Sequence, residues 1–317
     1  MKSKSLIFAV ILGAVLPWVL FMVTEKVVGS EELPEATEAL QPEIKISINV
    51  LRADGNVDQM ELEEYVVGVV MGEMPSGFEM EALKAQAIAA RTFAVKSMYM
   101  NYKHDNCDVC TDSSCCQSYY DPKEFLSNGG DPQVLSKYQN AILDTAGQVL
   151  VYNGELIEAT YFSCSGGKTE DAVSVWGTDI PYLKSLVSPG EEHAAHFTYT
   201  VVMSASEFIR KLGEEPAGLP GTWIKGITYT RGGGVATICI GNKTYKGTEL
   251  RQKLGLRSTA FVMSVVGDSV TITTKGFGHR VGMSQYGADA MAVQGNTYIQ
   301  ILAYYYPGTS LSALDQI

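Results

Sequence analysis

The stretch EYVVGVVMGEMP, residues 64–75, decides how the fold of this 317-residue chain is interpreted. Its apolar residues recur at helical spacing from Leu62 onward. At ~100° per residue, Glu73 falls within about 20° of Leu62, on the apolar face of that helix. Pro75 disfavours helical geometry in the residue before it, so we expect the helix to end at Met74. The sequence therefore predicts a helix over 62–74 with a glutamate on the buried side of its end.

The position of Glu73 favours a protonated carboxyl group. Partial burial and the negative end of the helix dipole both oppose ionisation, so we expect its pKa to be raised. A carboxyl that stays protonated near neutral pH can act as a general acid. The alternative is an exposed glutamate at a helix end, which is what we expect of Glu61, Glu63 and Glu64.

A second helix is predicted over residues 79–100, where EALKAQAIAARTFAV (81–95) carries a narrow apolar stripe. Lys84 and Arg91 lie seven residues apart and therefore on one face of this helix. They could orient a sugar or complement Glu73. Equally, they could form a solvated stripe.

Two glycine-rich segments offer groups for binding. YFSCSGGKT (161–169) follows a predicted strand, and its paired glycines allow close backbone approach. Cys164 within it could be a nucleophile, although strand alternation favours a small buried residue. Candidate hydrogen-bond donors in this segment are Ser163, Ser165, Lys168 and Thr169.

The second glycine-rich segment is GFGHRVGMSQYG (276–287). Its four glycines predict a close-turning loop that presents His279 and then enters a helix capped by Ser284. His279 could be a structural residue that bonds across the loop, or it could contact a ligand.

Four of the six cysteines fall between Cys107 and Cys116, and His104 precedes them. The spacing allows a structural Zn²⁺ site that closes a loop with no apolar core of its own. Disulfide bonds are the competing interpretation, because the N-terminus indicates an extracytoplasmic compartment. The candidate zinc ligands are His104, Cys110, Cys115 and Cys116.

The N-terminus predicts a membrane anchor. Lys2 and Lys4 precede residues 6–23, which carry no charge and are just long enough to span a bilayer. By the positive-inside rule, residues 1–5 are then a cytoplasmic tip, and the acidic stretch 24–43 is a tether outside the cytosol. A cleaved signal peptide is the alternative, and it leads to the same compartment.

The rest of the chain, residues 44–317, has an α+β pattern of one or two lobes, with helices toward the ends and strands in the middle. With 46% hydrophobic residues it can bury a sizeable core. The net charge of −11 argues against nucleic acid as a partner. Further helices are expected over 132–145 and 205–212 and twice near the C-terminus. Strands are expected over 44–51, 148–152, 155–162, 224–230, 235–240, 260–266 and 269–274.

Five segments, collinear in the chain, resemble the stage II sporulation protein D family. The resemblance extends over essentially everything from about residue 44, and the single N-terminal anchor matches as well. It implies a peptidoglycan lytic transglycosylase, which cleaves between N-acetylmuramic acid and N-acetylglucosamine and leaves a 1,6-anhydro end, during engulfment of the forespore. The segments are EYVVGVVMGEMP (64–75), EALKAQAIAARTFAV (81–95), TDSSCCQSYYDP (111–122), YFSCSGGKTE (161–170) and GFGHRVGMSQYGADA (276–290).

The resemblance implies catalysis by Glu73 and no catalytic cofactor. Structural zinc is implied at His104, Cys110 and Cys116, whereas Cys115 stands where a histidine ligand would be expected. Arg280 stands where the family's string has a glycine. The resemblance carries over Arg91, His279, Ser284 and Gln285 as substrate-binding residues. Lys84, Ser163, Ser165, Lys168 and Tyr286 complete the predicted binding set.

The family also implies partners and a location. We expect peptide-stripped glycan strands as the preferred substrate, with a sporulation stage II amidase/endopeptidase and a membrane scaffold protein as partners. The expected location is the mother-cell engulfing membrane, with the catalytic domain extracytoplasmic. One alternative is a non-catalytic amidase enhancer that binds peptidoglycan, which the domain also resembles. Another is a secreted thiol–disulfide protein, although Cys107 and Cys110 follow a helix instead of opening one.

Overall fold

The computed structural model describes residues 45–100 and 103–317. The predicted cytoplasmic tip, membrane anchor and acidic tether lie outside these residues. Within them, no helix combines the length and the apolar character needed to cross a membrane. Two hydrophobic cores organise the described part of the chain.

The first core surrounds two helices that pack against each other, α1 (Leu62–Glu73) and α2 (Met80–Met100). Buried valines of α1 and the alanine-rich face of α2 meet there, because small side chains let the helices approach closely. The helices around them are α3 (Pro122–Ser127), α4 (Pro132–Leu143), α5 (Ala172–Trp176), α8 (Gln285–Val293) and α9 (Tyr298–Tyr305).

Three small sheets border the first core. In one, β1 (Ser47–Leu51) pairs antiparallel with β2 (Val57–Glu61) and parallel with β3 (Val109–Cys110). In another, β4 (Gln148–Tyr152) lies between β5 (Glu155–Leu156) and β14 (Ser310–Ala313). The third is the short parallel pair β6 (Tyr161–Phe162) and β13 (Met283–Ser284). This last pair holds the two glycine-rich segments side by side, and an isolated bridge between Cys164 and Phe277 extends it.

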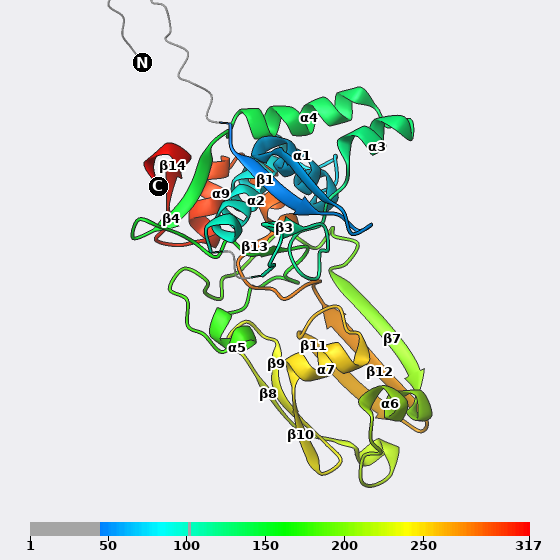
Figure 1. The fold of residues 1–317 in the computed structure, drawn as a ribbon. Helices are drawn as coiled ribbons and strands as arrows, with labels where there is room; N and C mark the ends of the chain where they lie inside the picture. The colour runs from blue at the N-terminus through cyan, green and yellow to red at the C-terminus, as the bar shows by residue number, and fades with distance from the viewer. Residues whose placement is uncertain (1–44, 101–102) are drawn as a thin grey trace, which may run out of the picture. The chain divides into compact units, whose positions relative to one another are not determined.

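The second core lies between two antiparallel three-stranded sheets and two helices, which Figure 1 shows grouped together in colours from yellow-green to orange. The order in one sheet is β10-β9-β8 and in the other β11-β12-β7. The strands are β7 (Thr198–Ser204), β8 (Ile224–Tyr229), β9 (Val235–Ile240), β10 (Lys243–Lys246), β11 (Phe261–Val266) and β12 (Ser269–Lys275). The helices are α6 (Ala205–Leu212) and α7 (Gly247–Leu254).

A buried ion pair between the two glycine-rich segments also contacts a turn of the second core. Arg280 and Glu170 are 2% and 1% exposed, and their charged atoms are 3.3 Å apart. The guanidinium of Arg280 also donates to the carbonyl of Gly232, in the β8–β9 turn of the second core. Glu170 accepts from the Gly234 N–H of the same turn. Because neither charged group is exposed to solvent, each is stabilised by the other and by its hydrogen bonds to the β8–β9 turn.

Most of the predicted elements are present with small shifts at their ends, and one differs in kind. The strand expected over 155–162 is divided into β5 and β6. Between them the Thr160 N–H donates to the carbonyl of Glu158, which turns the backbone out of an extended conformation. The division allows β5 to pair with β4 while β6 pairs with β13.

Candidate active site

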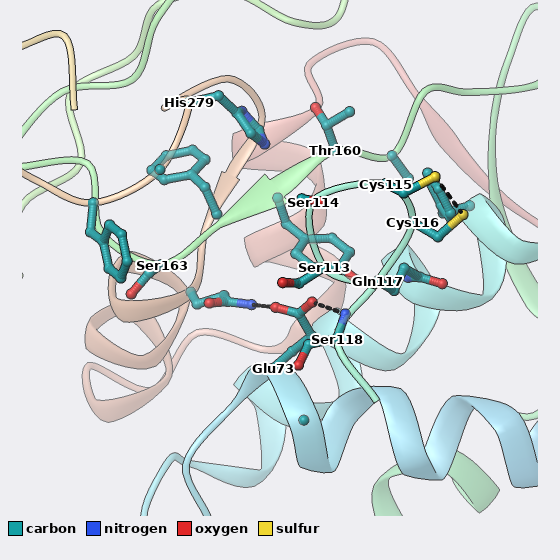
Figure 2. Close-up of a pocket in the computed structure, with 18 of the residues that line it drawn as sticks. Glu73, Ser113, Ser114, Cys115, Cys116, Gln117, Ser118, Thr160, Ser163 and His279 are labelled. Atoms are coloured by element: carbon teal, nitrogen blue, oxygen red, sulfur yellow. Dashed lines mark hydrogen bonds between the residues drawn. The ribbon is translucent and has the colours of Figure 1, made fainter. Parts of the chain in front are cut away.

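Glu73 is the last residue of α1, where Pro75 prevents another helical turn. One carboxylate oxygen accepts a hydrogen bond from the backbone N–H of Ser118 at 2.8 Å. The other accepts from the side-chain amide of Gln285, at the start of α8, at 3.0 Å. Figure 2 draws both bonds as dashed lines. The carboxyl is therefore fixed from two directions, by a loop and by a helix far along the chain.

The pKa of Glu73 is raised above its ordinary value, mainly because the carboxyl is largely removed from water. The hydrogen bonds from Ser118 and Gln285 oppose the shift, because both donors favour the charged form. Burial outweighs them. The expectation of a raised pKa is thus confirmed, and a protonated Glu73 can serve as a general acid at higher pH than an exposed glutamate could.

A pocket of about 700 Å³ opens over Glu73. Its volume is within the range usual for ligand sites. Both glycine-rich segments, the cysteine loop and one residue of α7 contribute to its walls. Among the described residues that line it, Glu73 is the sole carboxylate. A second hollow of about 340 Å³ adjoins on the other side and shares Gly72 and Glu73 with the first.

His279 lies across the pocket from Glu73 (Figure 2). Its ring packs edge-on against Phe162 and is tilted against Trp176. Burial and the nearby charge of Arg251 lower the pKa of His279 to about 4. The Val281 N–H donates to Nδ1 at 3.1 Å. The imidazole is therefore neutral at neutral pH, and it is both a wall of the pocket and a structural residue of its loop.

Of the other predicted binding residues, Ser163 and Gln285 line the pocket. Ser165, Lys168, Ser284 and Tyr286 do not line it. Buried Ser165 donates to Glu191, and Lys168 donates to the carbonyl of Arg231. Ser284 is buried and caps α8, as expected, and the ring of Tyr286 packs against Phe78. Ser165 and Ser284 are fully buried, which does not fit direct contact with a substrate, whereas for the half-buried Lys168 and Tyr286 that role stays a prediction.

The predicted role of Lys84 and Arg91 in orienting a sugar also does not fit the structure. Both lie on one face of α2, as the spacing required, but neither lines the pocket. Arg91 is fully buried and binds Glu63 with its guanidinium, at 2.7 Å for the shortest contact. Lys84 pairs with Asp144 and Glu81. Glu63 is consequently not the exposed helix-end residue that the pattern suggested.

Cys164 does not behave as a nucleophile. It is fully buried, and its thiol donates to the carboxylate of Glu191 at 3.3 Å. Burial raises the pKa of this thiol to about 12, so the reactive thiolate is absent at neutral pH. The alternation argument for a small buried residue is confirmed.

The four predicted metal ligands converge beside the pocket. Their donor atoms all lie within 4.8 Å of one another: His104, Cys110, Cys115 and Cys116. The His104 Nε2 atom is 3.3 Å from the sulfur of Cys116 and 3.7 Å from that of Cys115. Tetrahedral zinc with bonds of ~2.0–2.3 Å separates its ligands by roughly 3.3–3.8 Å, so the donor set fits that ion. All six cysteines are free thiols.

Four residues that shape this site were not among the predicted site residues. Ser118 acts through its backbone N–H, which no sequence pattern marks. Gln117 joins two buried tyrosines behind the pocket by accepting from Tyr65 and donating to Tyr161. Trp176 and Arg251 line the pocket from elements with little apolar period of their own.

Comparison with known proteins identifies relatives of the chain. The family model described as stage II sporulation protein matches residues 53–152. Stage II sporulation protein D of Bacillus subtilis is 44% identical over 277 residues, covering 85% of this chain and 80% of the relative. The protein of the same name from Bacillus amyloliquefaciens is 42% identical over 287 residues, with 88% and 83% covered. An amidase enhancer of B. subtilis is 28% identical over 78% of this chain and 40% of its own length.

Proposed function

The chain belongs to the stage II sporulation protein D family, whose role is in sporulation, and from this premise we propose that it is a lytic transglycosylase acting on peptidoglycan glycan strands. The observation that carries the proposal is a single carboxyl with a raised pKa at the floor of an open pocket. A hydrolase of the usual kind needs two carboxyl groups across the scissile bond. The described lining residues supply one, Glu73.

One acid is enough if the nucleophile belongs to the substrate. Glu73 protonates the glycosidic oxygen as it leaves C1 of N-acetylmuramic acid. The 6-hydroxyl oxygen of the same sugar then bonds to C1 and closes a 1,6-anhydro ring, and its proton returns to the Glu73 carboxylate. The amide of Gln285 and the N–H of Ser118 hold that carboxylate in place between the two transfers. No water is consumed.

The second hollow beside Glu73 supports a polymeric substrate. Because Gly72 and Glu73 line both hollows, a strand in one can continue past the acid into the other. Ser163 and the neutral His279 offer polar contacts on the larger side, and Trp176 offers an apolar face of the kind that packs on sugar rings.

We propose that zinc holds the pocket wall. His104, Cys110, Cys115 and Cys116 are the ligands, and Cys115 and Cys116 also line the pocket. Bound there, the ion would cross-link a loop of low apolar content, and all four protein ligands would leave no open position for chemistry. The loop ends at Ser118, which bonds to Glu73.

The cellular setting is proposed on family membership. It comprises a single-pass anchor over residues 6–23, an extracytoplasmic domain at the mother-cell engulfing membrane, and an amidase/endopeptidase and a membrane scaffold as partners. The partner amidase would remove the peptides and so supply the peptide-free glycan strands.

The deciding experiment compares the full-length chain with Glu73→Gln on peptide-stripped glycan strands, with products identified by mass spectrometry. We expect ends of 1,6-anhydro-N-acetylmuramic acid from the wild type, and a loss of at least about 100-fold in rate from the variant, since general acid catalysis contributes that much or more. Glu64→Gln, an exposed glutamate on the same helix, is the matched control and should retain full rate. Reducing ends in place of anhydro ends would contradict the proposal.

The amidase-enhancer relative favours a second candidate function, in which the pocket binds wall glycan without cutting it. The same variants separate the two functions. An enhancer would bind glycan and stimulate an amidase equally well with glutamine at position 73, and neither protein would release anhydro ends.

A further inference from the structure

Arg251 brings a guanidinium from the second core into the pocket over Glu73. It lies on α7 and, among the described residues that line this pocket, is one of three with an ionisable acidic or basic side chain other than histidine, with Glu73 and Lys103. Its charge is felt across the pocket wall, since it helps to lower the pKa of His279. Arg251 is thus the contribution of the β7–β12 region to the site of chemistry.

The guanidinium has no acceptor within the described part of the protein. Its Nε atom is buried without a hydrogen-bond partner, and no carboxylate of a described residue pairs with it. Lys103, by contrast, donates to the carbonyl of Cys115 and lies over the ring of Phe93. A buried N–H without an acceptor is unfavourable, and more so on a charged group. The protein therefore leaves a cationic group of the pocket lining without an acceptor among the described residues.

The surroundings of Arg251 suit an anion. The chain as a whole carries a net charge of −11, which repels anions. An unpaired cation in a pocket therefore provides a local site to which an anion can bind. The neighbouring His279 is neutral and does not compete for a negative group. Of the described lining residues, the one acidic group is Glu73, whose carboxyl is already engaged by Ser118 and Gln285. The planar fork of a guanidinium matches a carboxylate in two parallel hydrogen bonds.

We propose that Arg251 binds the free lactyl carboxylate of an N-acetylmuramic acid residue in the glycan strand. This inference rests on the proposed function and deepens it by assigning substrate selection to one residue. When a peptide is attached, the lactyl carboxyl is an amide, which is neutral and presents a single acceptor oxygen. Arg251 then loses both the charge and one of the two bonds. Arg251 thus distinguishes a sugar from which the peptide has been removed from one that still carries it.

The test uses one batch of peptide-free glycan oligomers, half of it converted to methyl amides at the lactyl carboxyl. We expect the full-length wild type to process the carboxylate form with a kcat/KM roughly 10- to 100-fold above that of the amide form. Arg251→Gln should fall to the amide rate on both substrates, and Arg251→Lys should recover part of the preference as a point charge. Arg210→Gln, which removes an exposed charge from α6 of the same core, is the matched control and should keep the preference.

Binding is measured separately in the Glu73→Gln background, so that the result does not depend on cleavage. Trp176 lines the pocket and contacts His279, whereas Trp223 is buried in the second core, so quenching of tryptophan fluorescence reports occupancy. Tighter binding of the carboxylate form that Arg251→Gln abolishes would support the inference even if no strand were cut. Equal binding and equal cleavage of both forms by the wild type would overturn it and leave the proposed activity standing. An equal loss on both forms in Arg251→Gln would also overturn it, as a structural effect.

Discussion

The pKa of Glu73 is set by opposing effects of its neighbours, and each effect can be tested by changing one residue. Burial keeps the proton on, and two hydrogen-bond donors favour its release. A group with both properties is suited to give up a proton and take one back within a single reaction. The balance is set by neighbours, so it can be moved without touching the acid itself.

Gln285→Leu should move the pH dependence of cleavage in a defined direction. Loss of the amide donor removes a bond that stabilises the charged carboxylate, so the pKa of Glu73 rises further. Because the acid must be protonated, kcat/KM falls as pH rises through this pKa, and the fall should move to higher pH. A profile of kcat/KM against pH measures it, with the exposed Gln133→Leu as control. A shift to lower pH, or none, would contradict this account of the carboxyl.

Single residues differ in how far the sequence could identify them. Glu73 was found because the helical period and Pro75 together fix both its face and its position at the helix end. Arg91 was placed on the correct face but given the wrong surroundings, because the period of α2 does not reveal that Glu63 would meet it. Arg251 was not among the predicted site residues. What distinguishes it is that its buried Nε atom has no hydrogen-bond partner among the described residues, and the spacing of residues in the sequence does not show this.

At the scale of elements, the cysteine loop and α1 are fitted to each other closely. A Cβ at Gly72 would lie 2.9 Å from backbone atoms of Ser118 and Tyr119, and one at Gly68 would clash with the ring of Tyr119. At Gly72 the backbones of loop and helix therefore meet directly, and at Gly68 the Tyr119 ring packs on the helix backbone. This contact places the Ser118 N–H against Glu73 and makes the position of the acid depend on the shape of the loop.

Metal removal is expected to act through this loop. We expect about one zinc per wild-type chain by elemental analysis, and none in Cys110→Ser or after treatment with a strong chelator. Both should lower the melting temperature and slow glycan cleavage, because the Ser118 donor is no longer held. Cys239→Ser, which lies outside the cluster, should keep the metal. A wild-type protein that purifies without zinc and binds none on addition would contradict the assignment.

At the scale of the whole molecule, Arg280 connects the loops of both cores. Its guanidinium donates to the carbonyls of Ser165, Lys168 and Gly232 as well as to Glu170. The residue also adopts a φ of 67°, a left-handed conformation that favours glycine. The backbone strain at this position is therefore accompanied by four hydrogen bonds, three to the 161–170 segment and one, to Gly232, to the second core.

Arg280→Met should lower the free energy of unfolding by about 3–5 kcal/mol, because it leaves the Glu170 carboxylate buried without its counter-ion. Chemical denaturation of the full-length chain measures the loss. Arg280→Gly removes the same pair but relieves the left-handed strain, so it should be less destabilising by about 1–3 kcal/mol. If both variants unfold within 1 kcal/mol of the wild type, the junction does not depend on this pair.

The arrangement of elements was predictable where local pattern decides it, as for the helix expected over 205–212, which is α6, and the strands expected over 224–230 and 235–240, which are β8 and β9. It was not predictable where distant parts decide it. Division of the 155–162 segment depends on β13, more than a hundred residues later. The ion pair between Arg280 and Glu170 likewise forms only in the assembled fold. Nothing in the sequence around Arg280, which has the positive φ typical of glycine, indicates that its side chain is buried.

The hydrogen bond between Glu73 and Gln285 joins residues 212 positions apart. Because the chain is synthesised N-terminus first, Glu73 is made early and its site is completed late. Until α8 has emerged and folded back, Glu73 lacks its amide partner and the pocket lacks the wall that carries His279. A truncated chain without α8 would carry Glu73 without its amide partner. The site is therefore complete only when nearly the whole chain has been made and folded.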